Sequence, residues 1–296
     1  MNILEINQDN RYLSVFRGFL RISSEGNKLA DIALDSIMAV LITGNQAAFS
    51  SCIMAELAEK CIPLIICGKN YHPVGMFLAV EGNYKQAEVI ENQINTTLPF
   101  RKNLWKSIVE EKIINQAKVL KFLKKKYEDI ETLGRNVKSG DSGNFEAQAA
   151  RLYFPRLFGL DFLRNYTGGG INAFLNYGYA VIRAAIARYT VAAGFLPSQG
   201  LHHKNKMNPF CLVDDLMEPY RPIVDLSVYE FFKGDCNVEK ELKPEDKKIL
   251  AGLLEKNIKT EQGYSPLNTC MQRFVWSLAE SYRIKEITLE FQKNLI

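Results

Sequence analysis

The periodicity of the apolar residues changes once along this chain of 296 residues, near Gly82 and Asn83. Before this point, segments 12–22 and 32–42 alternate apolar and polar side chains and are rich in β-branched and aromatic residues, which is typical of strands. After it, apolar residues recur at helical spacing over long segments. We therefore expect an α+β protein, with a small β-rich N-terminal domain at 1–83 and a larger all-α domain at 84–296.

Single elements follow from the same patterns. In the first part we expect a helix over 46–60 and a short buried strand over 62–68. In the second part the expected helices cover 87–97, 105–132, 145–157, 171–194, 223–233, 244–257 and 268–285. The polar segment 135–144 is expected to be a linker before the helix that carries Glu146.

The composition is that of an ordinary soluble protein, with 47% hydrophobic and 24% charged residues. No apolar run reaches the roughly 20 residues that cross a bilayer, and the N-terminus does not resemble a signal peptide. Six cysteines without a CxxC pair indicate reduced thiols. We therefore expect a cytoplasmic protein without a membrane contact.

Basic residues concentrate between Arg101 and Lys126, although the net charge of the chain is only +4. Such a stripe can follow a phosphate backbone, and a solvated helix face explains it equally well. The candidate DNA contacts in this stripe are Arg101, Lys102, Lys124, Lys125 and Lys126.

The segment from Gly200 to Pro222 holds two of the three histidines and, after a short basic turn, three carboxylates. Imidazole and carboxylate together are ligand chemistry for Mn²⁺ or Mg²⁺, and the intervening Lys204 and Lys206 are suited to phosphate. Because His202 and His203 are adjacent, they point in different directions, so we expect only one of them to act. The three carboxylates are those of Asp214, Asp215 and Glu218.

The acids have a structural alternative. On a helix, Glu218 shares a face with Asp214 or with Asp215, which is electrostatically costly unless a cation lies between the two. If no cation binds there, these acids would only cap the N-terminus of a helix. Glu146 lies in the first turn of its expected helix, where the helix dipole alone favours an acid. The histidine segment gives Glu146 its weight as a functional candidate.

Four motifs in this order resemble the Cas1 family of CRISPR-associated integrases. They are EAQAARLYF from Glu146, NAFLNYGY from Asn172, GLHH from Gly200 and DLMEPYRP from Asp215. The resemblance implies a β-rich domain before a helical domain, which agrees with the patterns above. It also implies that Glu146, His203 and Glu218 are the catalytic metal ligands for Mg²⁺ or Mn²⁺, with Asp215 as an additional acid and His202 as the weaker histidine.

By the same resemblance, the chain would be an endonuclease and integrase that inserts spacer DNA into CRISPR arrays in antiviral defence. The reaction would be a transesterification by a DNA 3′-hydroxyl. The implied partners are double-stranded DNA (prespacer and repeat), a second copy of the chain paired through the β-rich domains, and a small ferredoxin-like adaptation protein. A glutamate at 218 and the short length are similar to type II systems, which implies further type II adaptation proteins.

Two other classes remain open from the sequence. A covalent recombinase or relaxase would use a tyrosine as the nucleophile, and Tyr153 and Tyr220 lie near the candidate site. A relaxase, however, needs two histidines separated by one residue, unlike His202 and His203. The other class is a DNA-binding scaffold with a degenerate site, whose acids would only cap helices.

Overall fold

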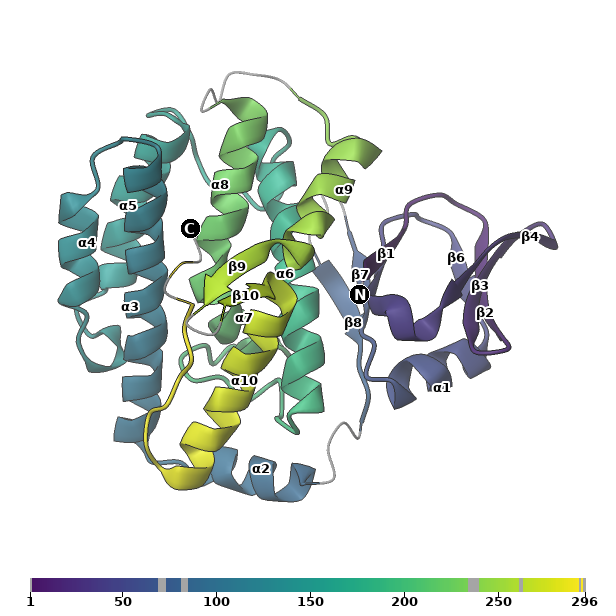
Figure 1. Ribbon diagram of the computed structural model, residues 1–296, viewed down its shortest axis with the longest axis horizontal. Helices are drawn as coiled ribbons and strands as arrows, with labels where there is room; N and C mark the ends of the chain where they lie inside the picture. The colour runs from purple at the N-terminus through teal and green to yellow at the C-terminus, as the bar shows by residue number, and fades with distance from the viewer. Residues whose placement is uncertain are drawn as a thin grey trace.

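The computed structural model describes residues 2–68, 73–80, 85–233, 240–260, 263–292 and 294. Two four-stranded sheets form the N-terminal region (Figure 1). The first has the order β1-β5-β7-β8, and its strands are β1 (Asn2–Ile6), β5 (Ile37–Ile42), β7 (Leu64–Cys67) and β8 (Pro73–Phe77). The second has the order β4-β3-β2-β6, and its strands are β2 (Arg11–Phe16), β3 (Phe19–Ser24), β4 (Asn27–Ala33) and β6 (Ala47–Phe49).

One apolar core joins the two sheets and helix α1 (Ser51–Glu59). Leu13 and Leu20 of the second sheet, Val40 of the first and Leu57 of α1 are all buried in it. In the first sheet, β5 pairs in parallel with β1 and with β7, and all six of its residues are buried. This explains the continuous apolar run at 37–42, because a central strand covered on both faces needs apolar side chains on both.

Residues 12–22, predicted as one strand-forming stretch, are in fact a hairpin. β2 and β3 pair antiparallel, and the turn between them places Arg17 and Gly18 at φ values of 51° and 80°. Only glycine takes such angles without strain, and Gly18 provides one of the two positions. The alternation continues across the turn, so periodicity alone did not reveal it.

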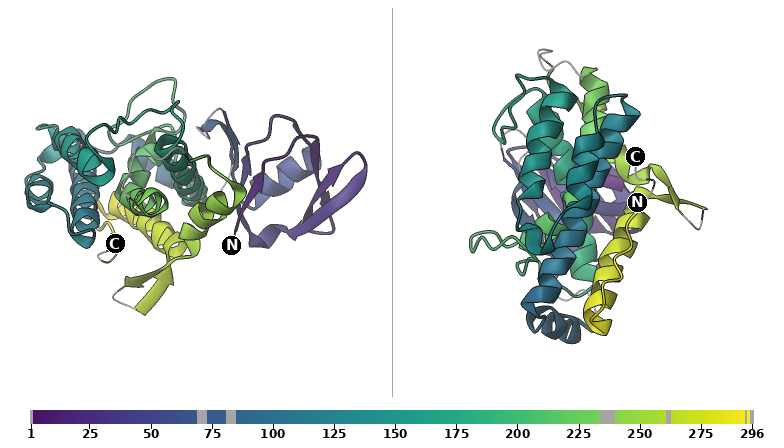
Figure 2. Two further views of the ribbon diagram at one scale, coloured as in Figure 1. Left: turned by 90° about the horizontal axis from the view of Figure 1, so that it is seen from above. Right: turned by 90° about the vertical axis from the view of Figure 1, so that its left-hand side faces the viewer.

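The rest of the chain is mainly helical, as predicted. Its helices are α2 (Gln86–Ile94), α3 (Leu98–Phe122), α4 (Glu128–Arg135), α5 (Phe145–Phe158), α6 (Ile171–Ala192), α7 (Cys211–Met217), α8 (Arg221–Phe232), α9 (Pro244–Gly252) and α10 (Leu267–Ile284). A hairpin of β9 (Asn257–Thr260) and β10 (Gly263–Pro266) interrupts them and projects from the helical region (Figure 2). The sequence did not predict this hairpin, because strands of four residues are too short to show a clear alternation of apolar and polar side chains.

Several boundaries differ from the sequence prediction. The predicted helix 46–60 begins only at Ser51, because residues 47–49 form strand β6, which pairs with β2. The predicted helix 105–132 is two helices, because α3 ends at Phe122 and Lys124 adopts a left-handed conformation with φ 56°. The segment 135–144, predicted to be a polar linker, connects α4 to α5 and contains a short 3-10 turn at Ser139–Asp141. The predicted domain boundary at residue 83 lies outside the described residues.

Helix α6 is the centre of the helical region and also contacts the first sheet (Figure 1). It is buried along most of its length and packs against α7, α8, α9 and α10. Arg188 of α6 donates hydrogen bonds to the carbonyl oxygens of Ile37 and Met38 at the start of β5. No helix in the described part of the chain is long and apolar enough to cross a membrane.

Candidate active site

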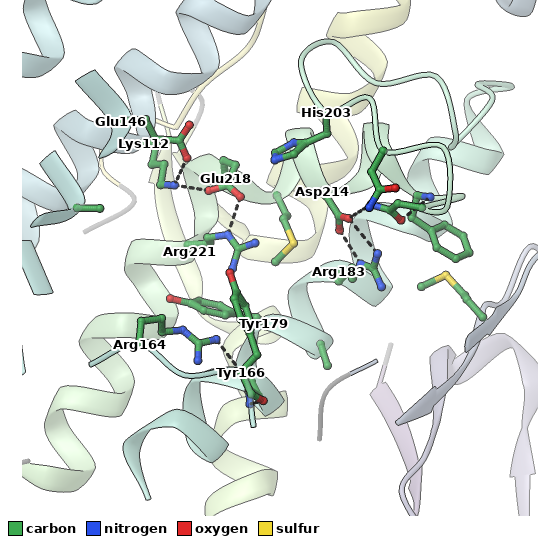
Figure 3. Close-up of a pocket in the computed structure, with 18 of the residues that line it drawn as sticks. Lys112, Glu146, Arg164, Tyr166, Tyr179, Arg183, His203, Asp214, Glu218 and Arg221 are labelled. Atoms are coloured by element: carbon green, nitrogen blue, oxygen red, sulfur yellow. Dashed lines mark hydrogen bonds and ion pairs between the residues drawn. The ribbon is translucent and has the colours of Figure 1, made fainter. Parts of the chain in front are cut away.

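A cleft of about 1020 Å³ lies among β8, α3, α5, α6, α7 and α8. Glu146, His203 and Glu218 all line it, although they are separated by up to 72 positions along the chain (218 − 146). Figure 3 shows Glu146 and Glu218 approaching one another, with His203 on a loop beside them. The tertiary structure thus brings the three predicted ligands into one cavity.

Glu146 begins α5, but it does not cap this helix. Asp141 does so, because its carboxylate oxygens accept from the backbone N–H groups of Phe145 at 2.8 Å and Glu146 at 3.1 Å. The Glu146 side chain instead extends to Lys112 of α3, whose Nζ lies 2.6 Å from Oε1. Glu146 thus lies in the first turn of α5, as predicted, and its side chain has a specific ion pair in addition to the favourable helix dipole.

Glu218 lies in the single 3-10 turn between α7 and α8 and is only 4% exposed. Its Oε1 accepts from Arg221 Nε at 2.8 Å, and its Oε2 lies 2.5 Å from Lys112 Nζ. Burial acts to raise the pKa of this carboxyl, but Arg221 and Lys112 outweigh it and lower the pKa to about 2. Glu218 is therefore an anion at any physiological pH.

Lys112 joins the two acids, and the sequence analysis placed it only within the basic stripe. It is 9% exposed, and Ile108, Val109 and Ile113 beside it on α3 are fully buried. Burial acts to lower the pKa of its ammonium, but Glu218 and Glu146 outweigh this, so the pKa is raised. A lysine within an apolar stretch of a helix was the available signal, since an unpaired ammonium there is costly.

His203 is positioned by Asp215. The Nδ1 atom of the imidazole lies 2.5 Å from Oδ1 of this fully buried aspartate. Asp215 also accepts from the backbone N–H groups of Leu201 at 2.6 Å and His202 at 3.0 Å, which fixes the loop. The hydrogen bond to Asp215 raises the pKa of His203 despite partial burial. Nε2 remains available for a ligand.

His202, next to His203, and Asp214, next to Asp215, both make contacts that stabilise the fold. The ring of His202 stacks on Trp105 of α3, with 4.6 Å between the ring centres and 6° between the planes. Asp214 accepts from Arg183 Nε at 2.6 Å and from Asn208 Nδ2 at 2.7 Å. The structure therefore gives His202 and Asp214 different surroundings from His203 and Glu218, a difference that sequence spacing alone could not reveal.

The donor set fits a hard divalent cation. No three described histidine, cysteine or acidic side chains are already arranged as a metal site. However, two carboxylates of this cleft converge on one positive charge, the ammonium of Lys112. The buried Oε2 of Glu218 has this ion pair but no hydrogen bond. Two carboxylates and an imidazole are ligands that Mg²⁺ and Mn²⁺ accept.

Two arginines in the same cleft were not identified from the sequence. Arg183 pairs with Asp214 and lies 5.2 Å from the Phe210 ring centre. Arg164 donates to Asn176 Oδ1 at 2.6 Å and lies 4.6 Å from the ring centre of Tyr166. They come from separate segments of the chain and have no local motif, so only the fold reveals that they share the cavity (Figure 3).

The predicted DNA contacts do not form one uniform surface. Lys204 and Lys206 are exposed on the loop after His203, and Lys102, Lys124 and Lys126 are exposed near the ends of α3. Arg101 is half-buried. Lys125 donates to the carbonyl oxygens of Arg156 at 2.6 Å and Leu157 at 3.0 Å, which gives it a structural role at the end of α5.

The tyrosines considered as nucleophiles are buried. Tyr153 is 0% and Tyr220 is 2% exposed, and burial raises the pKa of both phenols far above the ordinary value. A phenol in this environment cannot reach a DNA phosphate and cannot ionise readily. The structure contradicts the covalent-tyrosine alternative at both positions.

Comparisons with known proteins agree with this architecture. The family model described as CRISPR-associated protein Cas1 matches residues 4–261. The CRISPR-associated endonuclease Cas1 of Neisseria meningitidis serogroup C (strain 8013) is 36% identical over 272 residues, which cover 91% of this chain and 88% of the relative.

Two solved structures share the fold. A casposase bound to an integration product has a TM-score of 0.82 and 22% identity, covering 100% of this chain and 94% of that one. A chain of a Cas6-RT-Cas1–Cas2 complex has a TM-score of 0.78 and 16% identity, covering 98% of this chain and 36% of that one. Since a family model matches most of the chain and a relative over 30% identical covers nine-tenths of it, this chain belongs to the CRISPR-associated Cas1 family.

Proposed function

We propose that this chain is a metal-dependent DNA endonuclease and integrase that joins new spacer DNA to a CRISPR array. The observation that carries the proposal is the convergence of Glu146 and Glu218 on a single cation in a cleft that His203 also lines. Family membership supports the endonuclease activity, and the likeness to a casposase bound to an integration product supports strand transfer.

Glu146, His203 and Glu218 would hold Mg²⁺ or Mn²⁺. The bound ion would polarise the scissile phosphodiester and stabilise the negative charge of the transition state. Arg221 fixes the Glu218 carboxylate through its 2.8 Å hydrogen bond, and Asp215 fixes the His203 ring through Nδ1. These two contacts keep both ligands oriented before DNA arrives.

The remaining charge of the cleft suits a phosphate backbone. Arg164 and Arg183 line the cavity, and Lys204 and Lys206 are exposed on the neighbouring loop. In strand transfer, the 3′-hydroxyl oxygen of the incoming DNA bonds to phosphorus, and the bond from phosphorus to the 3′ oxygen of the target strand breaks. The hydroxyl loses its proton as the new bond forms, and the released 3′ oxygen gains one.

Partners belong to the same proposal. The complex that contains Cas1 and Cas2 supports assembly with a small ferredoxin-like adaptation protein. We also propose that the chain forms a homodimer through the β-rich region at 1–83 and that the region at 84–296 is catalytic. Further type II adaptation proteins would join the complex.

The test is strand transfer of a short duplex with 3′-hydroxyl ends into a supercoiled plasmid that carries a repeat array. Each reaction contains Mg²⁺, Mn²⁺ or EDTA, with and without the small partner. We expect metal-dependent joining by the wild type, lowered by about a hundredfold or more in Glu146→Ala, His203→Ala and Glu218→Ala. Glu286→Ala, which removes an exposed acid of the helical region outside the cleft, is the control and should join DNA normally.

The outcomes separate the classes of function. Joining by all three ligand variants at the wild-type rate would refute the proposed site. An absence of joining by any protein, with the partner present, would favour the DNA-binding scaffold. Retained DNA binding in the three variants would show that they lose chemistry and not their fold.

A further inference from the structure

We propose that Lys112 is a placeholder cation, whose ammonium occupies the two glutamates until a divalent metal displaces it. The inference rests on the proposed function, because it takes Glu146 and Glu218 as metal ligands. It assigns to Lys112 a role that neither the motifs of the chain nor its basic stripe indicates. Lys112 is thus a positioning residue that competes with the metal.

The contacts place the ammonium where a shared cation must lie. Lys112 Nζ is 2.6 Å from Glu146 Oε1 and 2.5 Å from Glu218 Oε2, so a single atom bridges one oxygen of each proposed ligand (Figure 3). Oε2 of Glu218 is buried and has no hydrogen bond. If the ammonium moved away and nothing replaced it, this oxygen would lose its counter-charge in a buried environment, which is strongly unfavourable.

The charges of the cluster balance without a metal. Two carboxylates, Glu146 and Glu218, face two cations, Lys112 and Arg221. A divalent ion would add two positive charges to a neutral group, and it would come close to the ammonium. Metal binding therefore requires the departure of one cation.

Lys112 is the cation that can leave. Arg221 is held by its hydrogen bond to Glu218 and by the ring of Tyr179, whose centre is 4.5 Å from its guanidinium carbon. Lys112 has a flexible four-carbon stem that ends at a compact ammonium, and its described ion partners are the two glutamates. The side chain lines the cleft, so a displaced ammonium has the open cavity beside it.

Removal of this charge has two opposite effects. Without metal, Lys112→Met leaves two carboxylates facing one another with one cation fewer, so the folded state should lose stability. With metal, the ion no longer competes with an ammonium, so its affinity should rise. A lysine that only stabilised the fold would give the first effect without the second.

The experiment titrates Mn²⁺ into the full-length, metal-free protein by calorimetry and by the electron paramagnetic resonance signal of free Mn²⁺. Lys112→Met and Lys112→Gln are compared with the wild type, and the glutamine variant retains a hydrogen-bond donor without the charge. Lys118→Met is the matched control, because it removes a lysine of the same helix that contacts Glu111 at 4.0 Å and does not line the cleft. Melting temperatures are recorded with and without Mn²⁺.

We expect Mn²⁺ to bind about tenfold or more tightly to both Lys112 variants than to the wild type and Lys118→Met. Mn²⁺ should also raise the melting temperature of the Lys112 variants more than that of the wild type. Unchanged or weaker Mn²⁺ binding in the Lys112 variants would overturn the placeholder role. Mn²⁺ binding that is unaffected by Glu146→Ala and Glu218→Ala would instead refute the metal site of the proposed function.

Discussion

At the scale of single residues, the candidate site depends on side chains that orient or neutralise His203 and Glu218. Asp215 is fully buried and organises the loop of His203 through contacts with its ring and with the loop backbone, so we expect it to act beside the proposed ligands. Arg221 and Lys112 neutralise Glu218, whose pKa falls to about 2 even though burial opposes this. Glu218 thus remains charged because specific cations face it.

The contact between Asp215 and His203 predicts a pH dependence. The raised pKa of His203 means that this pair stabilises the fold fully below the ordinary value of 6.5, and that the contribution is lost as the pH rises through the raised pKa. A proton on the ring competes with metal, so Mn²⁺ affinity should fall as the pH falls through the same range.

Asp215→Asn should lower the pKa of His203 toward its ordinary value and shift the acid limit of Mn²⁺ binding to lower pH. It should also cost about 2 kcal/mol of unfolding free energy, because the charged acceptor of the loop is lost. NMR titration of the His203 ring and urea unfolding measure the two effects. An unchanged imidazole pKa in this variant would contradict the assignment.

At the scale of elements, the basic segment that follows α3 contains two kinds of lysine that its sequence does not separate. Lys125 binds the last-turn carbonyls of α5, and burial lowers its pKa, whereas Lys126 next to it is exposed. A cation at the C-terminal end of a helix satisfies carbonyls that have no partner within the helix. The same stripe therefore contains both structural and solvent-facing charges.

Lys125→Ala should lower the free energy of unfolding by about 1–2 kcal/mol, since it removes two hydrogen bonds from a charged donor. Lys126→Ala should leave stability unchanged and weaken DNA binding at low salt, regardless of DNA sequence. Urea unfolding and DNA titrations at several salt concentrations distinguish them. A loss of DNA affinity without a loss of stability in Lys125→Ala would reverse this assignment.

At the scale of the whole molecule, a buried ion pair connects the first sheet to the helices. Glu5 of β1 lies 2.6 Å from Lys247 Nζ of α9 and accepts hydrogen bonds from Thr43 at 2.6 Å and Tyr177 of α6 at 3.1 Å. The side chains of Glu5 and Lys247 are 14% and 7% exposed. Together with Arg188, this cluster holds the β-rich and helical regions against one another.

Glu5→Gln should cost about 3 kcal/mol, because it removes the carboxylate that faces the buried ammonium of Lys247. Glu5→Gln combined with Lys247→Met should cost less than the sum of the two single changes, since neither charge is then unpaired. Chemical denaturation of the four proteins gives the coupling energy. Strict additivity would show that the pair contributes nothing to the junction.

The order of the β-rich and helical regions and most of the helices could be predicted from the sequence, because periodicities of 2 and 3.6 residues are local properties of the chain. Motifs that resemble those of the family also singled out Glu146, His203 and Glu218, whose role as ligands stays a prediction. The hairpin turn at Arg17–Gly18 and the break after α3 were missed, since nothing in the apolar pattern changes there.

The pairing of the buried charges, in contrast, depends on tertiary packing. Lys112 reads as one more lysine of a basic stripe, yet the packing of α3 against α5 and the turn after α7 places it between two acids. Asp141, and not Glu146, caps α5, and Lys125 closes the end of that helix. Contacts between residues distant in sequence depend on how helices pack, and no local pattern encodes the partner of a buried charge.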